Sequence, residues 1–249
     1  MKSRFTGTRI EGPASPGRTS ITMLDQTGKK AHRTPSPELL QLDIARNRPA
    51  RRAGSYVGKP TTQGFYWFEQ TGEHVWWESM TEYTALMHVD HVEAVADICS
   101  QPLLITFADG SEHFPDIFIR YVDGRQELCN VRPRTLLDDV TAAKFDATEA
   151  ICADVGWTHR VLDELTLVER NNLEWLASVR HPRNRPSPEL AAELLECAST
   201  PVRYGQLWEI TQRQSDPAAV AGLHNLMWQR ALLFDPTEPH QFDTLIWRP

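Results

Sequence analysis

The chain has 249 residues, 41% hydrophobic and 24% charged, a composition typical of a globular protein with one large domain or two small ones. No apolar run approaches the roughly 20 residues of a membrane span, and no segment near the start resembles a signal peptide, so we expect a cytoplasmic protein without a membrane partner. The net charge of −7 excludes a uniformly basic nucleic-acid binder, but residues 1–60 hold 12 Lys and Arg against 4 Asp and Glu.

Residues 1–54 are rich in Pro, Ser, Thr, Gly and Arg, which predicts a basic, largely flexible arm with one short helix over residues 36–45. This arm has two interpretations: it touches a phosphate backbone, or it is a solvated tail without a partner. The four cysteines lie far apart and form no CxxC pair, so the sequence indicates neither a zinc site nor a disulfide framework.

Residues 62–79 predict a β-hairpin that turns at Gln70-Thr71-Gly72. Its tryptophans, Trp67, Trp76 and Trp77, fit packing within a sheet better than stacking on nucleic-acid bases. A helix is predicted from Ser79 to about residue 88.

Glu82, in the first turn of that helix, has two interpretations. The spacing Ser79-x-x-Glu82 fits a capping box, in which the carboxylate accepts from the Ser79 backbone N–H. Alternatively the carboxylate is a metal ligand. His88 and His91 flank Asp90 close to the end of the helix, and HVDH without further ligands is more typical of a helix end than of a metal site.

Three strands are predicted next, as an antiparallel meander over residues 103–107, 114–121 and 126–131. Asp109-Gly110 and Asp123-Gly124 supply the turns, because Asp-Gly between alternating apolar runs is a strong hairpin signal.

The second of these hairpins carries polar side chains on one face. The strand period of two places Asp116 on one strand opposite Asn130 and Arg132 on the next. A carboxylate facing an amide and a cation is the arrangement of a metal-dependent phosphodiesterase, although a β-sandwich could carry the same residues as an ordinary polar face.

The remaining sequence predicts a helix over residues 138–154 that Gly156 ends, a strand over 157–162 and a helix over 165–179. Helices alternating with strands indicate an α/β core with a mixed sheet. The Pro- and Arg-rich segment 183–188 marks a domain boundary. Three helices (187–198, 204–212 and 215–231) and two short strands then describe a winged-helix domain over residues 186–249.

The order and spacing of these motifs resemble the TnsA-like endonuclease subunits of heteromeric transposases, whose catalytic fold is that of type II restriction enzymes. The resemblance covers roughly residues 55–182. The matching features are Ser79-x-x-Glu82, Gln101-Pro102, Pro115-Asp116 and Asn130-Val131-Arg132-Pro133.

The resemblance implies a restriction-endonuclease-like nuclease domain over residues 55–182, with Glu82, Asp116 and Asn130 as metal ligands and Arg132 as the fourth catalytic residue. Mg²⁺, or Mn²⁺ in its place, takes oxygen ligands and delivers water to a phosphate. Asn130 stands where many family members have a carboxylate, and Arg132 replaces the usual Lys. A guanidinium holds phosphate charge but does not act as a proton-shuttling base.

Lys144 on the following helix is either a migrated substitute for the motif lysine or a solvated surface residue. The function implied is a Mg²⁺-dependent endonuclease that cuts double-stranded DNA at transposon ends beside an integrase-type transposase. An AAA+ regulatory ATPase is the partner implied for the C-terminal domain. The alternative is a catalytically weakened DNA-binding or assembly subunit of a transposition complex.

Overall fold

The computed structural model describes residues 7–13, 17–52 and 62–249. Contacts divide the chain into two compact units: an N-terminal unit of residues 1–86 and 93–164, and a C-terminal unit of residues 87–92 and 165–249. The boundary between them thus falls at Glu164–Leu165, not at the predicted linker over 183–188, because helix 165–179 packs with the C-terminal helices. The other predicted boundary, at residues 54 and 55, lies outside the described residues.

The N-terminal unit is built on a four-stranded mixed sheet in the order β12-β11-β10-β7. Its strands are β7 (Val95–Ser100), β10 (Ile117–Tyr121), β11 (Gln126–Val131) and β12 (Thr158–Leu162). The β10–β11 hairpin turns at Asp123-Gly124 as predicted, with Gly124 in the left-handed region at φ 86°. β12 runs parallel to β11, which the crossover helix α2 (Asp139–Val155) makes possible. Asp138 caps α2 and Gly156 ends it.

The predicted three-strand meander is wrong. β8 (Leu104–Thr106) pairs with β9 (Glu112–His113) and with β2 (Ser20–Leu24), in a second sheet of order β3-β2-β8-β9 that includes β3 (Lys30–Arg33). The neighbour that β10 takes instead is β7, a strand the sequence pattern did not indicate. β7 is buried along nearly its whole length, so its residues lack the polar alternation of a half-buried strand.

The predicted flexible arm is also wrong for the described residues before 53. Ile21 and Met23 of β2 are buried in the main hydrophobic cluster, together with Leu39 and Ile44. The helix predicted over 36–45 is two 3₁₀ turns, η1 (Pro37–Gln41) and η2 (Ile44–Arg46). The same cluster contains Ile151, Cys152 and Val155 of α2, so α2 and the N-terminal segment are parts of one core.

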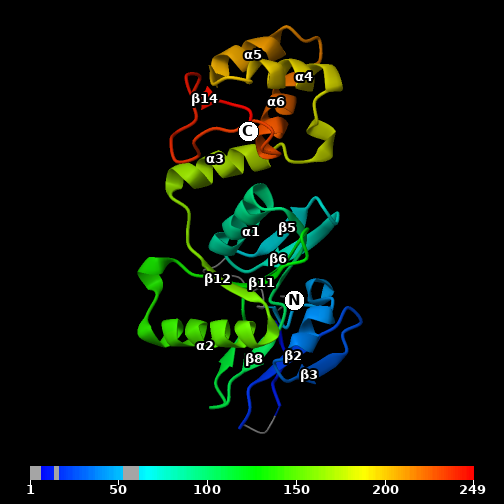
Figure 1. Ribbon diagram of the computed structural model, residues 1–249, viewed down its shortest axis with the longest axis vertical. Helices are drawn as coiled ribbons and strands as arrows, with labels where there is room; N and C mark the ends of the chain where they lie inside the picture. Colours follow the sequence, from blue (N-terminus) through cyan, green and yellow to red (C-terminus); the bar gives the residue numbers. More distant parts are fainter. Residues whose placement is uncertain (1–6, 14–16, 53–61) are drawn as a thin grey trace, which may run out of the picture. The chain divides into compact units, whose positions relative to one another are not determined.

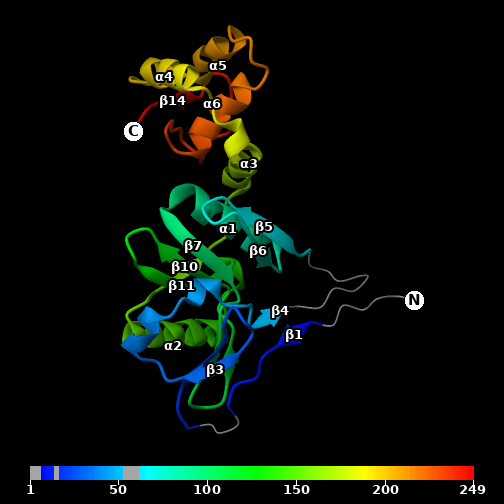
Figure 2. The ribbon, with the colours of Figure 1, turned by 90° about the vertical axis from the view of Figure 1, so that its right-hand side faces the viewer.

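Two further pairs of strands and the start of α1 complete the N-terminal unit. β5 (Gly64–Phe68) and β6 (Glu73–Trp77) form the predicted hairpin, and α1 (Met80–Val92) begins three residues later. β1 (Thr8–Arg9) pairs with β4 (Arg51–Arg52), as Figure 2 shows. The turn η3 (Arg134–Leu136) leads from β11 toward α2.

The C-terminal unit is mainly helical (Figure 1). It consists of α3 (Leu167–Ala177), α4 (Pro188–Cys197), α5 (Tyr204–Gln212), α6 (Ala219–Trp228) and the turn η4 (Pro182–Asn184), with β13 (Val202–Arg203) paired to β14 (Leu245–Ile246). Leu233 and Trp247 form one further bridge. This order is compatible with a winged helix, which stays a prediction.

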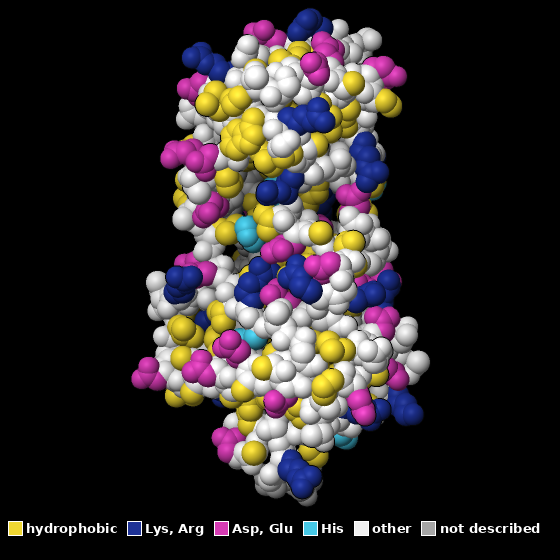
Figure 3. Space-filling model, viewed as in Figure 1, with side chains coloured by type: hydrophobic (Ala, Val, Ile, Leu, Met, Phe, Trp, Pro, Cys, Tyr) yellow, Lys and Arg dark blue, Asp and Glu magenta, His cyan; other side chains and the backbone are white. Residues whose placement is uncertain are grey.

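The described residues include six α-helices, and none of these is apolar over enough of its length to cross a bilayer. Acidic and basic side chains are interspersed on the face shown in Figure 3. The fold class is therefore the predicted mixed α/β arrangement, consistent with a restriction-endonuclease-like core.

Candidate metal centre

Glu82 is placed by the first turn of α1, immediately after the β5–β6 hairpin. Its backbone N–H donates to the Ser79 hydroxyl oxygen (3.2 Å), and the Ser79 hydroxyl donates back to its carboxylate (3.1 Å). The other carboxylate oxygen accepts from the Glu78 backbone N–H (2.9 Å). The predicted capping box is therefore modified: the backbone donor belongs to Glu78, one residue before the Ser79 N–H that the sequence suggested.

Asp116 lies directly before β10, where the chain passes from the second sheet into the first. One carboxylate oxygen accepts from the Val131 backbone N–H at 2.8 Å, and the other accepts from the Gln101 side-chain amide at 3.3 Å. Gln101 is fully buried and has a left-handed backbone at φ 49°, unusual for a residue other than glycine. Asp116 is thus held by neighbours on both sides of its strand.

The structure brings the Glu82 and Asp116 carboxylates into one site, although 33 positions separate them in the chain. Burial, and after it the nearby Asp116 charge, raise the pKa of Glu82 to about 7. Burial likewise raises the pKa of Asp116 to about 6, against the opposing effects of the Val131 N–H and the Arg51 charge. Two carboxylates that resist ionisation together are typical of sites where a cation balances their charge.

Asn130 on β11 is buried next to this pair, and its amide hydrogen-bonds to Asp116. The amide nitrogen lies 2.9 Å from Nε2 of His113, and the amide oxygen accepts from Nε2 of His159 at 3.0 Å. In this orientation Asn130 offers N–H groups to Asp116 and His113 and its oxygen to His159. The predicted role of Asn130 as a metal ligand would require the amide to turn over, so it stays a prediction.

His113 and His159 are site residues that the sequence analysis missed. Burial lowers the pKa of His113 to about 4 and also lowers that of His159, so both rings are neutral at pH 7. Each ring also contacts Phe145 of α2, with centroid distances of 5.9 and 6.1 Å. They come from β9 and β12, and no local pattern in the sequence connects them to Asn130.

Arg132 and Lys144 are directed elsewhere by their hydrogen bonds. The Arg132 guanidinium donates twice to the Leu136 carbonyl, at 2.9 and 3.1 Å, and so holds the η3 turn after β11. The Lys144 ammonium donates to the Glu112 carbonyl at 3.4 Å, beside His113. These bonds place the two cations around the site rather than between its carboxylates.

Arg51 is the cation whose charge acts on Asp116, and the sequence analysis had assigned it to the flexible arm. Its guanidinium forms an ion pair with Glu78 (3.1 Å) and lies over the Phe114 ring, 5.4 Å from the centroid. The pairing of β1 with β4 fixes this position, which the local sequence does not reveal.

A divalent metal ion fits the chemistry of this donor set. Mg²⁺ commonly binds through one or two carboxylates and keeps several waters, which matches Glu82 and Asp116. No group of three or more His, Cys, Asp or Glu in the described residues is arranged to hold a metal ion. A cation held by these two side chains would therefore depend on water or a phosphate for its remaining ligands.

Comparison with known proteins supports the nuclease assignment. Residues 92–164 match the family model described as TnsA-like endonuclease N terminal. The matched segment contains Asp116, Asn130 and Arg132, and begins ten residues after Glu82. No curated protein matches the chain. The resemblance inferred from the sequence motifs is thus confirmed for residues 92–164, which are similar to the N-terminal domain of TnsA-like endonucleases.

Proposed function

We propose that the chain is the metal-dependent DNA endonuclease subunit of a transposition complex, with Glu82 and Asp116 as its metal ligands. It cleaves phosphodiester bonds of double-stranded DNA at transposon ends, next to an integrase-type transposase that completes the strand transfer. The observation that carries the proposal is the convergence of two partly buried carboxylates whose pKa values are raised to about 7 and about 6.

A bound Mg²⁺ or Mn²⁺ would polarise the scissile phosphate and activate a water molecule. The protein's own residues prepare the site. Gln101 and the Val131 N–H hold the Asp116 carboxylate in one orientation, and Ser79 and Glu78 do the same for Glu82. Arg51 lies on the Asp116 side and is suited to hold the phosphate of the cleaved strand, because a guanidinium binds two phosphate oxygens at once.

Cleavage of a supercoiled plasmid bearing both transposon ends, with the partner transposase and Mg²⁺ or Mn²⁺ present, tests the proposal. Asp116→Ala and Glu82→Ala should abolish cleavage, whereas Asp123→Ala, in the exposed hairpin turn, should cut like the wild type. Calorimetric titration with Mn²⁺ gives a second readout. Each ligand variant should bind the metal at least about 10-fold more weakly, because even indirect losses at metal sites have that effect. Equal cleavage by Asp116→Ala and the wild type would show that Asp116 is not a ligand of the catalytic metal.

A second candidate function is an assembly subunit with weakened or absent cleavage. The observation that favours it is the commitment of Arg132 to the Leu136 carbonyl and of the Asn130 oxygen to His159. In that case the wild-type chain supports assembly of the complex but cuts under no divalent metal, while the partner transposase still joins its strand.

A further inference from the structure

Arg9 and Arg51 face each other across the two-stranded ribbon that β1 and β4 form (Figure 2). They are register partners, so their two side chains leave the ribbon on the same side. Both guanidiniums lie over the Phe114 ring, with their central carbons 5.1 and 5.4 Å from its centroid. Phe114 precedes Asp116 by two residues, and the Arg51 charge acts on the Asp116 carboxylate. This pair of cations therefore adjoins the candidate metal centre.

Two like charges opposite each other in a ribbon oppose its formation. Acidic side chains offset this repulsion: Glu112 pairs with Arg9, and Glu78 pairs with Arg51 at 3.1 Å. Each pair uses only the Nη2 atom of its arginine, although a guanidinium has five N–H donors. In Arg51 the other terminal nitrogen, Nη1, has no partner among the described residues and is not buried. The Arg9 and Arg51 side chains are 58% and 39% exposed, so a ligand in solvent can reach both.

Lys144 of α2 extends this pair to three cations, which we call the cation row. Its ammonium donates to the carbonyl oxygen of Glu112 at 3.4 Å, and the carboxylate of the same residue pairs with Arg9. The cation row therefore begins at Arg51, next to the carboxylate pair, and continues through Arg9 to Lys144. The whole chain has a net charge of −7, but the cation row holds three positive charges against the two acidic side chains that pair with it.

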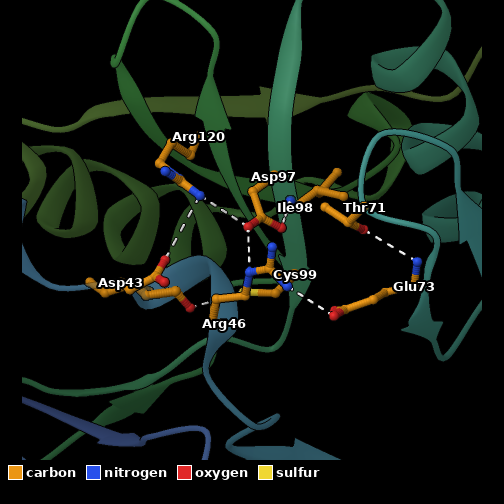
Figure 4. A network of polar contacts seen from close by, with 9 residues as sticks. Asp43, Arg46, Thr71, Glu73, Asp97, Ile98, Cys99 and Arg120 are labelled. Atoms are coloured by element: carbon orange, nitrogen blue, oxygen red, sulfur yellow. Dashed lines mark hydrogen bonds and ion pairs between the residues drawn. The ribbon is translucent and has the colours of Figure 1, made fainter.

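Arginines that support the fold of this unit have a different environment. Arg46 and Arg120 both pair with the Asp97 carboxylate, at 2.8 and 3.1 Å, and the Asp97 side chain is only 3% exposed (Figure 4). Removing either arginine from such a buried pair is costly, because the carboxylate loses part of its compensating charge. The Glu112 side chain is 30% exposed, so its pair with Arg9 contributes little to stability and can yield to a phosphate, which binds a guanidinium through two oxygens.

We infer that the cation row binds neighbouring phosphates of the cleaved DNA strand, on one side of the phosphate that is cut. The inference rests on the proposed function, which puts the scissile phosphate at the metal centre and next to Arg51. A strand that continues over the ribbon meets Arg9 and then Lys144, and each neutralises one phosphate. Phosphate contacts fix the register of a strand without reading its sequence. The cation row thus decides which bond of the strand reaches the two carboxylates.

Binding of a labelled duplex of arbitrary sequence to the full chain, followed by fluorescence anisotropy in EDTA, tests the inference without cleavage. Each neutralised phosphate contributes about 0.9 to the slope of the logarithm of affinity against the logarithm of salt concentration. Arg9→Gln and Lys144→Gln should each reduce this slope by about 0.9 and weaken binding about 5- to 10-fold near 0.1 M salt. Arg9→Lys retains the charge and should retain the slope.

Glu112→Gln distinguishes a phosphate contact from a structural ion pair. It frees Arg9 for the phosphate and should strengthen DNA binding by up to about 5-fold, the value of an exposed ion pair. If the pair only holds the ribbon in place, Glu112→Gln and Arg9→Gln lose the same contact and neither strengthens binding. The matched control is the pair of Arg125 and Asp123 in the β10–β11 turn, where Arg125 is likewise 58% exposed. Arg125→Gln and Asp123→Asn should each change binding about 2-fold or less, because they remove the same charges away from the cation row.

Thermal melting checks that each variant is folded. If Arg9→Gln unfolds, the opposite signs expected for Glu112→Gln and Lys144→Gln still decide the question. Wild-type slopes in the variants of the cation row, or equal losses in Arg125→Gln, would overturn the inference and leave the metal centre unaffected. A full chain that binds no duplex would overturn the inference together with the proposed function. Wild-type cleavage by Asp116→Ala would count against the metal centre alone, because binding in EDTA does not depend on it.

Discussion

The proposed metal binding at neutral pH requires Glu82 and Asp116 both to carry a negative charge in one partly buried site. Their raised pKa values mean that the folded protein binds protons there more tightly than the unfolded chain does. This tighter proton binding contributes to the free energy of unfolding. For Glu82 the contribution is complete below its ordinary pKa of 4.5 and is lost as the pH rises through its folded pKa of about 7. A bound divalent cation would offset the repulsion between the two carboxylates and should restore the lost stability near pH 7 and above.

We therefore expect Glu82→Gln to stabilise the metal-free protein at pH 8. One pKa unit corresponds to about 1.4 kcal/mol, and partial exposure of Glu82 reduces the gain to about 1–2 kcal/mol. Thermal melting in EDTA between pH 4.5 and 8 measures the difference, which should vanish at the acidic end. Glu189→Gln, on the exposed start of α4, is the control and should melt like the wild type throughout. A wild type whose melting temperature is the same at both ends of this range contradicts the expectation.

Asn130 and Arg132 are the two positions at which this chain departs from the commoner acidic-x-Lys pattern of the TnsA-like endonucleases that it resembles. Asn130→Asp adds a third negative charge beside the metal and should lower the Mg²⁺ concentration needed for half-maximal cleavage. Arg132→Lys should preserve or raise the rate, if the position requires only a cation. The double variant restores the whole pattern and is the sharper test. Cleavage rates against Mg²⁺ concentration check all three variants, and an unchanged requirement in Asn130→Asp would show that position 130 does not face the metal.

At the scale of elements, the sequence predicts those helices and turns whose ends are determined by neighbouring residues in the chain. Asp-Gly turns and alternating apolar residues locate the β10–β11 hairpin, and Asp138 and Gly156 bound α2. The sequence did not predict β7, because a strand buried on both faces does not alternate between apolar and polar residues. In the site, Glu82 and Asp116 belong to local motifs, whereas Arg51 and His159 are placed by strand pairings between distant segments, which no local pattern encodes.

The pairing of β2 with β8 makes the N-terminal segment part of the nuclease core, which gives a test. Ile21 of β2 is fully buried and packs in the main cluster. Ile21→Ala should therefore destabilise the protein by about 2–5 kcal/mol, the range for truncating a large buried aliphatic side chain. Urea unfolding measures the loss. Val122→Ala, at a side chain 71% exposed, should lose less than about 0.5 kcal/mol. Equal urea midpoints for the two variants would show that β2 does not pack in the core.

At the scale of the whole molecule, charge is distributed unevenly along the chain. Residues 187–249 contain 4 Arg and no Lys against 8 Asp and Glu, the wrong sign for a DNA backbone. Most of α6 is buried, including Leu223, Leu226 and Trp228, so this helix has little polar surface to place in a groove. If this part is a winged helix, it is suited to a protein partner, and we propose the regulatory ATPase.

Residues 165–249 should accordingly bind duplex DNA no more tightly than about 10⁻⁴ M at physiological salt, the weak end of non-specific binding. Fluorescence anisotropy with a labelled transposon-end duplex measures this, and the full chain is the positive comparison. Circular dichroism first checks that the fragment is folded. Micromolar binding that weakens steeply with added salt would assign this part of the chain to DNA instead of to a protein partner.

The partnership of β2 and β8 also has a consequence during synthesis. Leu24 ends β2 and Leu104 begins β8, so about 80 residues are added after the first strand is made and before its partner starts. At about 5–20 residues per second this takes about 4–16 s, during which the edge of β2 that later pairs with β8 has no partner strand. An unpaired strand edge is a site of aggregation. The yield of soluble protein should therefore respond to translation speed and to chaperones that shield nascent chains, even in variants whose final stability is unchanged.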